Sequence, residues 1–150
     1  MSQSLSKNLI HLTFSTKDRQ PSLGPAIREG LHRYMTGILQ DLDSPVLAIN
    51  SVADHSHLLL NLSKNIPLAQ VVMEVKRGSS KWLKSQGPAY GQFHWQGGYG
   101  AFSIGQSGVP QLKSYIQRQT EHHRVKSFQE EFRALLKAYG VAFDETYLWT

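Results

Sequence analysis

A chain of 150 residues, 40% hydrophobic and 18% charged, can bury a core and is too hydrophobic to remain disordered, which predicts one globular domain. Its net charge of +5 favours a polyanionic partner, either nucleic acid or an anionic membrane surface. The absence of cysteine excludes disulfides and thiolate metal sites. No run approaches the roughly 20 apolar residues that span a bilayer, and residues 1–8 lack a signal-peptide core, so a cytoplasmic protein is expected.

The first two thirds of the chain alternate between strand and helix patterns. Strands are expected at about residues 8–15, 46–52 and 55–62, and amphipathic helices at about 25–42 and 67–85. Two short strands, at 93–96 and 99–104, form a predicted hairpin around Gly97-Gly98. The order β-α-β-β-α-β, with one extra short strand, predicts a ferredoxin-like α+β fold, an antiparallel sheet with helices on one face.

The last third of the chain is predicted to be helical. A glycine-rich segment at about 105–109 is expected to act as a hinge before a helix at about 110–123. A further helix begins after Ser127, which forms a capping box with Glu130, and ends at Gly140. We therefore expect a single domain, 1–150, made of a body (about 1–104), the hinge, the helix 110–123, and a C-terminal helix and tail (127–150).

A pair of histidines stands at the start of the strand expected at 55–62. Residues two apart on a strand face the same side, so His55 and His57 would present adjacent imidazoles while Ser56 points away. Two neutral imidazoles on a rigid strand are good ligands for a first-row metal ion. Taken alone, such a pair is more often structural than metal-binding.

A second group of polar residues lies on the helix expected at 110–123. Tyr115 and Gln119 are one turn apart on one face, and His122 continues that face. Taken alone, this pattern is more typical of a half-buried tyrosine with two polar neighbours and no catalytic role.

The ordered combination of His55-x-His57 on a strand and Tyr115-x-x-x-Gln119 on a late helix resembles the HUH single-tyrosine transposases of the small single-strand insertion sequences, including their repeat-associated relatives. The resemblance spans nearly the whole chain. It includes ADHSHLL at 53–59, WQGGYGAFS at 95–103, the residues Glu121-His122-His123 after Gln119, and the ending DETYLW at 144–149.

The resemblance implies an activity and a site. Tyr115 would be the nucleophile that cuts single-stranded DNA and keeps its 5′ end as a phosphotyrosine. His55, His57 and Gln119 would hold Mg²⁺ or Mn²⁺, with His122 close by. The substrate would be DNA with a hairpin near the end of an element. The protein would be a homodimer in which the tyrosine helix of one subunit completes the histidine pair of the other.

Exposed basic residues could bind the phosphates of such a substrate, with an aromatic side chain stacking on an unpaired base. A basic stripe on a helix is also commonly just a solvated surface. The candidates are Lys17, Arg19, Arg77, Lys81, Arg118 and Arg124.

The chain departs from the family at Ser56, where the residue between the histidines is usually apolar. Because this side chain is expected to point away from the metal, the change should affect packing more than chemistry. Three alternatives stand beside the transposase: a non-catalytic, domesticated hairpin-binding relative, a structural domain with buried histidines, and a hydrolytic zinc enzyme. The zinc enzyme would need a further ligand, for which the candidates are His11, His94, His122 and Asp54.

Overall fold

The computed structural model describes residues 2–119 and 126–150. Its strands are β1 (Leu9–Ser15), β2 (Val46–Ser51), β3 (His55–Asn61) and β4 (Gly100–Ser103). Its α-helices are α1 (Pro25–Asp41), α2 (Leu68–Lys84), α3 (Val109–Gln117), α5 (Phe128–Ala138) and α6 (Glu145–Leu148). Three single 3-10 turns lie at Lys17–Arg19, Pro88–Tyr90 and Gln106–Gly108.

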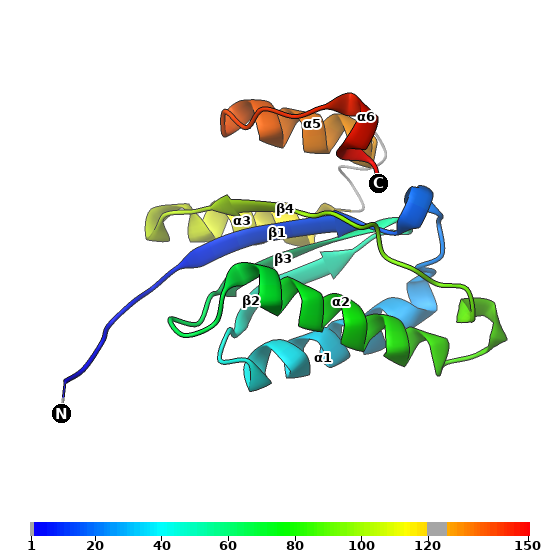
Figure 1. The fold of residues 1–150 in the computed structure, drawn as a ribbon, viewed down its shortest axis with the longest axis horizontal. Coiled ribbons are helices and arrows are strands. Elements are labelled where there is room, and N and C mark those ends of the chain that lie inside the picture. The colour runs from blue at the N-terminus through cyan, green and yellow to red at the C-terminus, as the bar shows by residue number, and fades with distance from the viewer. Residues whose placement is uncertain (1, 120–125) are drawn as a thin grey trace.

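The strands form one antiparallel sheet in the order β2-β3-β1-β4. Helices α1 and α2 cover one face of this sheet, whereas α3, α5 and α6 lie on the other side (Figure 1). The predicted ferredoxin-like α+β fold with additional C-terminal helices is therefore confirmed. The turn Gln106–Gly108 leads into α3 at the expected hinge, whose role as a hinge stays a prediction.

Both faces of the two central strands are buried, as their sequences suggest. Leu12 and Leu58 pair across β1 and β3 and point into the main core, against α1 and α2. Leu59, next in the strand, points to the other face and packs against α3. The period-two alternation of β3 therefore separates the main core from the layer in which the histidines lie.

Replacing Leu12 by alanine should lower the free energy of unfolding by about 2–5 kcal/mol, because it opens a cavity in a core that does not collapse freely. Leu12 is fully buried at the centre of the sheet. Urea unfolding measures the change, and Leu5→Ala serves as the control because Leu5 is exposed. An unfolding free energy for Leu12→Ala equal to that of the control would contradict this placement of the core.

The predicted hairpin at 93–104 is wrong in its first strand. Only 100–103 form a strand, and residue 95 makes a single isolated bridge to Thr16. The backbone groups that a hairpin would use are engaged elsewhere: Lys76 donates to the carbonyls of Gln96 and Gly98, and the Gly97 amide donates to the carbonyl of Thr150. Tertiary contacts therefore override the local turn signal of Gly97-Gly98.

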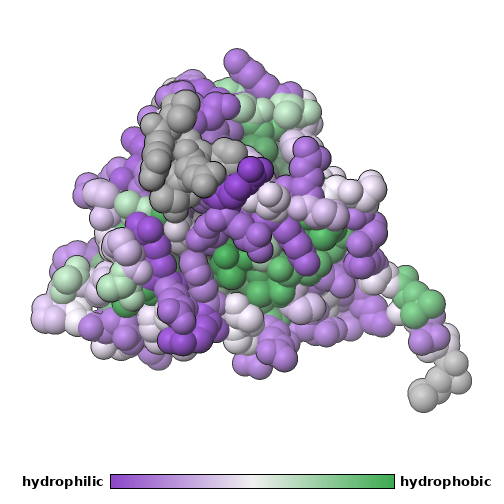
Figure 2. Space-filling view, turned by 180° about the vertical axis from the view of Figure 1, so that it is seen from behind, coloured by the Kyte–Doolittle hydropathy of each residue, from purple (hydrophilic) through white to green (hydrophobic). Residues whose placement is uncertain are grey.

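The surface is predominantly polar. Figure 2 shows the molecule from behind, with hydrophilic side chains over most of this face and hydrophobic ones gathered near its middle and its top. Large hydrophobic residues of the C-terminal segment that remain exposed are Tyr139, Val141, Phe143 and Tyr147. Among the described residues, no helix is both long and apolar enough to cross a membrane.

Candidate active site

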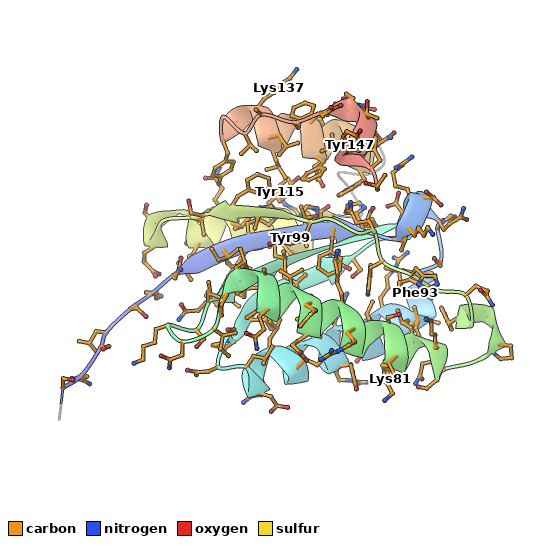
Figure 3. All side chains as sticks on the ribbon, viewed as in Figure 1. Lys81, Phe93, Tyr99, Tyr115, Lys137 and Tyr147 are labelled. Carbon is orange, nitrogen blue, oxygen red and sulfur yellow. The ribbon has the colours of Figure 1, made fainter. Side chains whose placement is uncertain are left out.

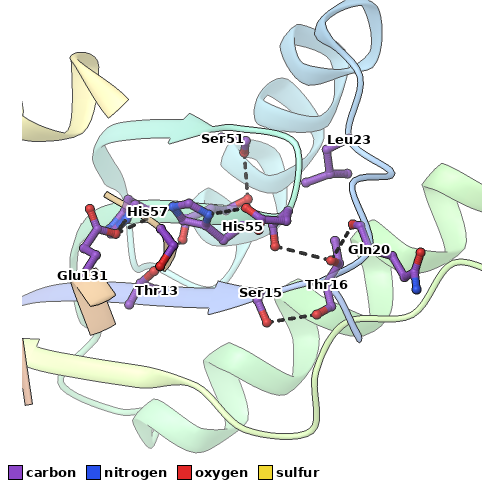
Figure 4. Close-up of polar contacts among 12 residues, drawn as sticks. Thr13, Ser15, Thr16, Gln20, Leu23, Ser51, His55, His57 and Glu131 are labelled. Carbon is purple, nitrogen blue, oxygen red and sulfur yellow. Dashed lines mark hydrogen bonds and ion pairs between the residues drawn. The ribbon is translucent and has the colours of Figure 1, made fainter. Parts of the chain in front are cut away.

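Strand β3 places His55 and His57 on the face opposite α1 and α2, with their ring centroids 5.2 Å apart. The expected shared face is confirmed, and both rings are buried, at 1% and 0% exposure. Ser56 points the other way, and its hydroxyl lies 2.7 Å from that of Ser51 (Figure 4). The serine therefore pairs with a polar neighbour on β2 and takes no part in the histidine cluster.

A fixed partner orients each imidazole through its Nδ1 atom. Nδ1 of His55 donates to Asp54 Oδ1 at 2.7 Å, and Nδ1 of His57 lies 2.8 Å from Nε2 of His11. Burial, and then the neighbouring His57, lower the pKa of His11 to about 3, so His11 is neutral and able to donate or accept. With both Nδ1 atoms engaged, both Nε2 atoms face the same side of the site.

The group that meets these two Nε2 atoms is the carboxylate of Glu131, on α5. Glu131 Oε1 lies 2.7 Å from His57 Nε2 and 3.6 Å from His55 Nε2, and the side chain is 4% exposed. The sequence analysis missed this residue. One feature of the sequence could have identified Glu131: it is a charged residue on the inward stripe of an amphipathic helix. It lies three residues after Phe128 and four before Leu135.

Tyr115 reaches the same carboxylate from α3. Its hydroxyl donates to Glu131 Oε2, and its ring stands edge-on to that of His57, with 5.8 Å between centroids. Figure 3 shows Tyr115 between the sheet and α5. Burial and the contact with Glu131 raise the pKa of Tyr115 well above its ordinary value, and a hydrogen bond with Gln119 opposes the change.

The prediction of a single continuous helix at 110–123 is wrong, because α3 ends at Gln117 and Arg118 departs from helical geometry. The side-by-side placement of the two residues still holds: beside the tyrosine, just beyond α3, lies the fully buried Gln119. Its Nε2 donates to the carbonyl of Tyr115 at 3.3 Å. The structure therefore brings together, within one chain, four residues that the sequence analysis selected: His55, His57, Tyr115 and Gln119. His122 lies outside the described residues, so its expected place beside them is not described.

The candidate DNA-binding residues are dispersed over the molecule. Lys81 lies on α2, across the sheet from Tyr115 (Figure 3), and Arg77, on the same helix, pairs with Glu74. Arg19 has its guanidinium 5.5 Å from the centre of the Trp149 ring. Lys17 and Arg118 are exposed, and Arg124 lies outside the described residues. The five candidates within the described part of the chain therefore do not form one binding patch.

The donor set of the cluster fits a divalent cation. One ligand atom each from His55, His57 and Glu131 lie within 4.8 Å of one another, and all three residues are buried. Two imidazole nitrogens and a carboxylate oxygen suit Mn²⁺ and also Zn²⁺. Of the zinc-ligand candidates, His11 and Asp54 lie behind the imidazoles on their Nδ1 side, and His94 is exposed.

His11→Phe should weaken binding of Mn²⁺ about 10- to 100-fold, because the partner that orients His57 is lost while the ring volume is kept. Isothermal titration of the purified protein with Mn²⁺ measures the change. His94→Phe is the matched control, since His94 is exposed and outside the cluster. Equal affinities for the two variants would show that His11 does not orient the site.

Fold and site together define a tyrosine transposase of the HUH type. The chain belongs to the family of IS200-like transposases, whose sequence model matches residues 4–119. The match ends at Gln119, so α5 and Glu131 lie beyond it.

Solved structures agree with this assignment. A protein of Deinococcus radiodurans R1 described as a transposase is 23% identical, with a TM-score of 0.62, over 79% of this chain and 98% of that one. A REP-associated tyrosine transposase bound to a REP hairpin is 15% identical, with a TM-score of 0.60, over 82% of this chain and 74% of that one. At these identities the likeness shows the fold. None of the curated proteins compared with the chain matches it significantly.

Proposed function

We propose that this transposase cuts and rejoins single-stranded DNA through a phosphotyrosine formed on Tyr115, with a divalent cation, Mg²⁺ or Mn²⁺, at His55 and His57. One observation carries the proposal: the Tyr115 hydroxyl and the His57 imidazole contact the two oxygens of a single buried carboxylate, that of Glu131. The nucleophile and the candidate cation ligands are therefore separated by the width of one small anionic group.

The chemistry follows from the residues present. A phenol, with a pKa near 10 in water, is a weak nucleophile until its phenolate is favoured. A cation bound at the imidazoles would polarise the phosphoryl oxygens of the DNA. The Tyr115 oxygen would then form a bond to phosphorus while the bond from phosphorus to the 3′ oxygen breaks. Since one phosphodiester replaces another, the step reverses onto a new 3′ hydroxyl and rejoins strands without ATP.

The oxygen ligand that accompanies the two imidazoles has two candidates. By resemblance it is the amide of Gln119, which lies beside Tyr115. By position it could equally be Glu131, whose carboxylate already meets both Nε2 atoms. The two candidates predict different effects of removing Glu131: if it is the ligand, affinity for Mn²⁺ falls, and if Gln119 is the ligand, affinity for Mn²⁺ is kept.

The proposed substrate is DNA carrying a hairpin next to the cleavage site. Its support is the hairpin bound by the similar REP-associated transposase, together with the net charge of +5. Lys17 and Arg118 are the preferred candidates for phosphate contacts, because both are exposed and make no described ion pair, whereas the equally exposed Lys81 lies across the sheet from Tyr115. We place this activity in the cytoplasm, where a transposase of this kind would meet its DNA.

Incubation with single-stranded and double-stranded versions of a hairpin-containing DNA, in the presence of Mn²⁺, tests the function. A covalent protein–DNA adduct on denaturing gels is expected with the single strand only. Hairpin binding without an adduct would instead identify a non-catalytic relative. Cleaved DNA without an adduct would identify a hydrolytic enzyme, for which Glu131 now supplies the third zinc ligand that the sequence analysis lacked.

The homodimer with sites completed in trans stays a prediction from the resemblance. Within the chain, Tyr115 contacts Glu131 and His57, which offers a site completed in cis as the alternative. If the sites are completed in trans, a mixture of Tyr115→Phe and His57→Ala proteins should form the adduct that neither protein forms alone, whereas heterodimers that form no adduct would show sites completed in cis. Heterodimers, if the protein dimerises, must be shown to form in the mixture. Recovered cleavage, up to about half of the wild-type level, would establish sites completed in trans.

A further inference from the structure

The candidate site is closed in this structure. His55, His57, Gln119 and Glu131 are all buried, and α5 lies over them on the side away from α1 and α2 (Figure 1). A DNA phosphate must contact both the tyrosine oxygen and the region between the imidazoles. It therefore cannot enter while Glu131 and α5 hold their present positions.

Glu131 occupies the place that such a phosphate would need. One of its oxygens faces the Nε2 atoms of the histidine pair, and the other accepts from the Tyr115 hydroxyl. A phosphodiester also presents two anionic oxygens from one central atom. The carboxylate thus makes, within the chain, the same pair of contacts that the proposed reaction requires of the substrate.

The contacts of the nucleophile agree with a resting site. The Tyr115 hydroxyl donates to Oε2 of Glu131, so a carboxylate of the chain itself engages the oxygen that would have to approach phosphorus. The arrangement seen here therefore opposes the reaction that the same residues are suited to perform.

We propose that residues 127–150, hereafter the cap, close the active site, and that Glu131 stands in for the scissile phosphate, so that the cap and single-stranded DNA compete for one position. The inference rests on the proposed function of the site. It concerns a segment that begins after the last residue matched by the family model.

Among the described residues, few apolar contacts join the cap to the body. The buried cluster beneath α5 takes Phe102 from the body and its other buried side chains from the cap, and the ring of Phe128 also lies against that of His55. A pocket of about 260 Å³ opens to solvent along the edge between the cap and the body, so the cap leaves part of the body's surface uncovered there. Its lining comes from β1, α3 and the cap, together with neighbouring loop residues: His11, Ile104, Leu112, Tyr115, Leu135 and Tyr139.

Two further contacts attach the far end of the cap to the body. The carbonyl of Thr150 accepts a hydrogen bond from the Gly97 amide, and the Trp149 ring packs beneath the guanidinium of Arg19. These are single contacts at the surface of the body. The buried carboxylate of Glu131 is thus the main polar attachment of the cap at the site.

Glu131→Gln in the full chain separates this inference from a role of Glu131 as cation ligand. If Glu131 is the competitor, the rate of adduct formation with single-stranded hairpin DNA should rise about tenfold, because a charge-assisted contact no longer favours the closed state. Affinity for Mn²⁺, measured by titration, should stay within about twofold of wild type, since the imidazoles are intact. Loss of both Mn²⁺ affinity and adduct formation would overturn the inference.

Glu130→Gln is the matched control, because it removes the adjacent charge from an exposed position at the start of the same helix. Gly100→Ala loosens the cap from the body side: a Cβ at Gly100 would collide with the ring of Phe132. This variant keeps Glu131 and should also speed adduct formation relative to the control. A slower rate in both Glu131→Gln and Gly100→Ala would contradict a displaceable cap.

Hydrogen exchange provides a readout that does not depend on cleavage. In DNA-free protein, the amides of α5 should exchange about tenfold faster in Glu131→Gln than in Glu130→Gln, with α2 unchanged as an internal reference. Equal exchange of α5 in the two variants would overturn the inference even if the wild type forms adducts. Conversely, faster exchange of α5 in Glu131→Gln, with no adduct in any variant, would support the closing role of the cap and reject the proposed function.

Discussion

Tyr115→Phe is expected to abolish the covalent protein–DNA adduct, a loss on the order of 10³-fold or more, comparable to removal of the nucleophile in other enzymes. The variant lacks the phenol oxygen that we propose bonds to phosphorus. It keeps the ring that packs edge-on to His57, so the site should retain its shape. The measurement is adduct formation on denaturing gels with single-stranded hairpin DNA and Mn²⁺, together with hairpin binding in native gels.

Hairpin binding by Tyr115→Phe should be retained at or above the wild-type level, because the lost hydroxyl also removes one contact that holds the cap, and this retention separates chemistry from recognition. Tyr139→Phe is the matched control, because Tyr139 lines the same cavity but its ring packs on Phe102, away from the carboxylate. An adduct of normal yield in Tyr115→Phe would assign the nucleophile to another residue.

His57→Ala is expected to produce the second large effect, the loss of both Mn²⁺ binding and adduct formation. His57 supplies one Nε2 atom of the cluster. This atom lies 2.7 Å from Glu131 Oε1, closer than the Nε2 atom of His55. The substitution also leaves the buried carboxylate without that partner, which should lower the free energy of unfolding by about 1–3 kcal/mol. Titration with Mn²⁺, the adduct gel and urea unfolding measure the three changes.

His32→Ala is the control for His57→Ala, because His32 is a partly buried histidine that bonds to Ser51 outside the cluster. It should bind Mn²⁺ and form adducts at wild-type levels. Retention of Mn²⁺ affinity in His57→Ala would show that the imidazole pair does not hold the cation.

Residues that follow a local period were predictable from the sequence. The alternation of β3 placed His55 and His57 on one face and Leu58 on the other, because a strand repeats every two residues. The spacing of Tyr115 and Gln119 likewise predicted that the two residues lie side by side, although α3 ends at Gln117 and Gln119 follows it. These predictions needed only the local geometry of the chain.

Features that depend on contacts between distant elements were not predictable in this way. Glu131 lies 74 positions after His57, and no local pattern relates the two residues. The partnership of His11 and His57 requires the pairing of β1 with β3 in one register. The mistaken hairpin strand has the same origin, since Lys76 on α2 takes the carbonyls that a local hairpin would have used.

The cap connects the fold to the regulation of the proposed reaction. If the closed state predominates, the observed cleavage rate equals the intrinsic rate multiplied by the fraction of molecules in which the cap is displaced. Substitutions at the interface of cap and body should therefore change the rate without changing the chemistry at Tyr115. The packing of Phe132 on Gly100 is the contact where this effect is easiest to isolate.

The central claim is that the oxygen of Tyr115 becomes bonded to DNA. Mass spectrometry of the protease-digested adduct tests it most directly, because it identifies the modified residue and the DNA end it carries. We predict a peptide containing Tyr115 linked to the 5′ phosphate of the cleaved strand. A nucleotide attached to any other residue, or cleaved DNA with unmodified protein, would contradict the account.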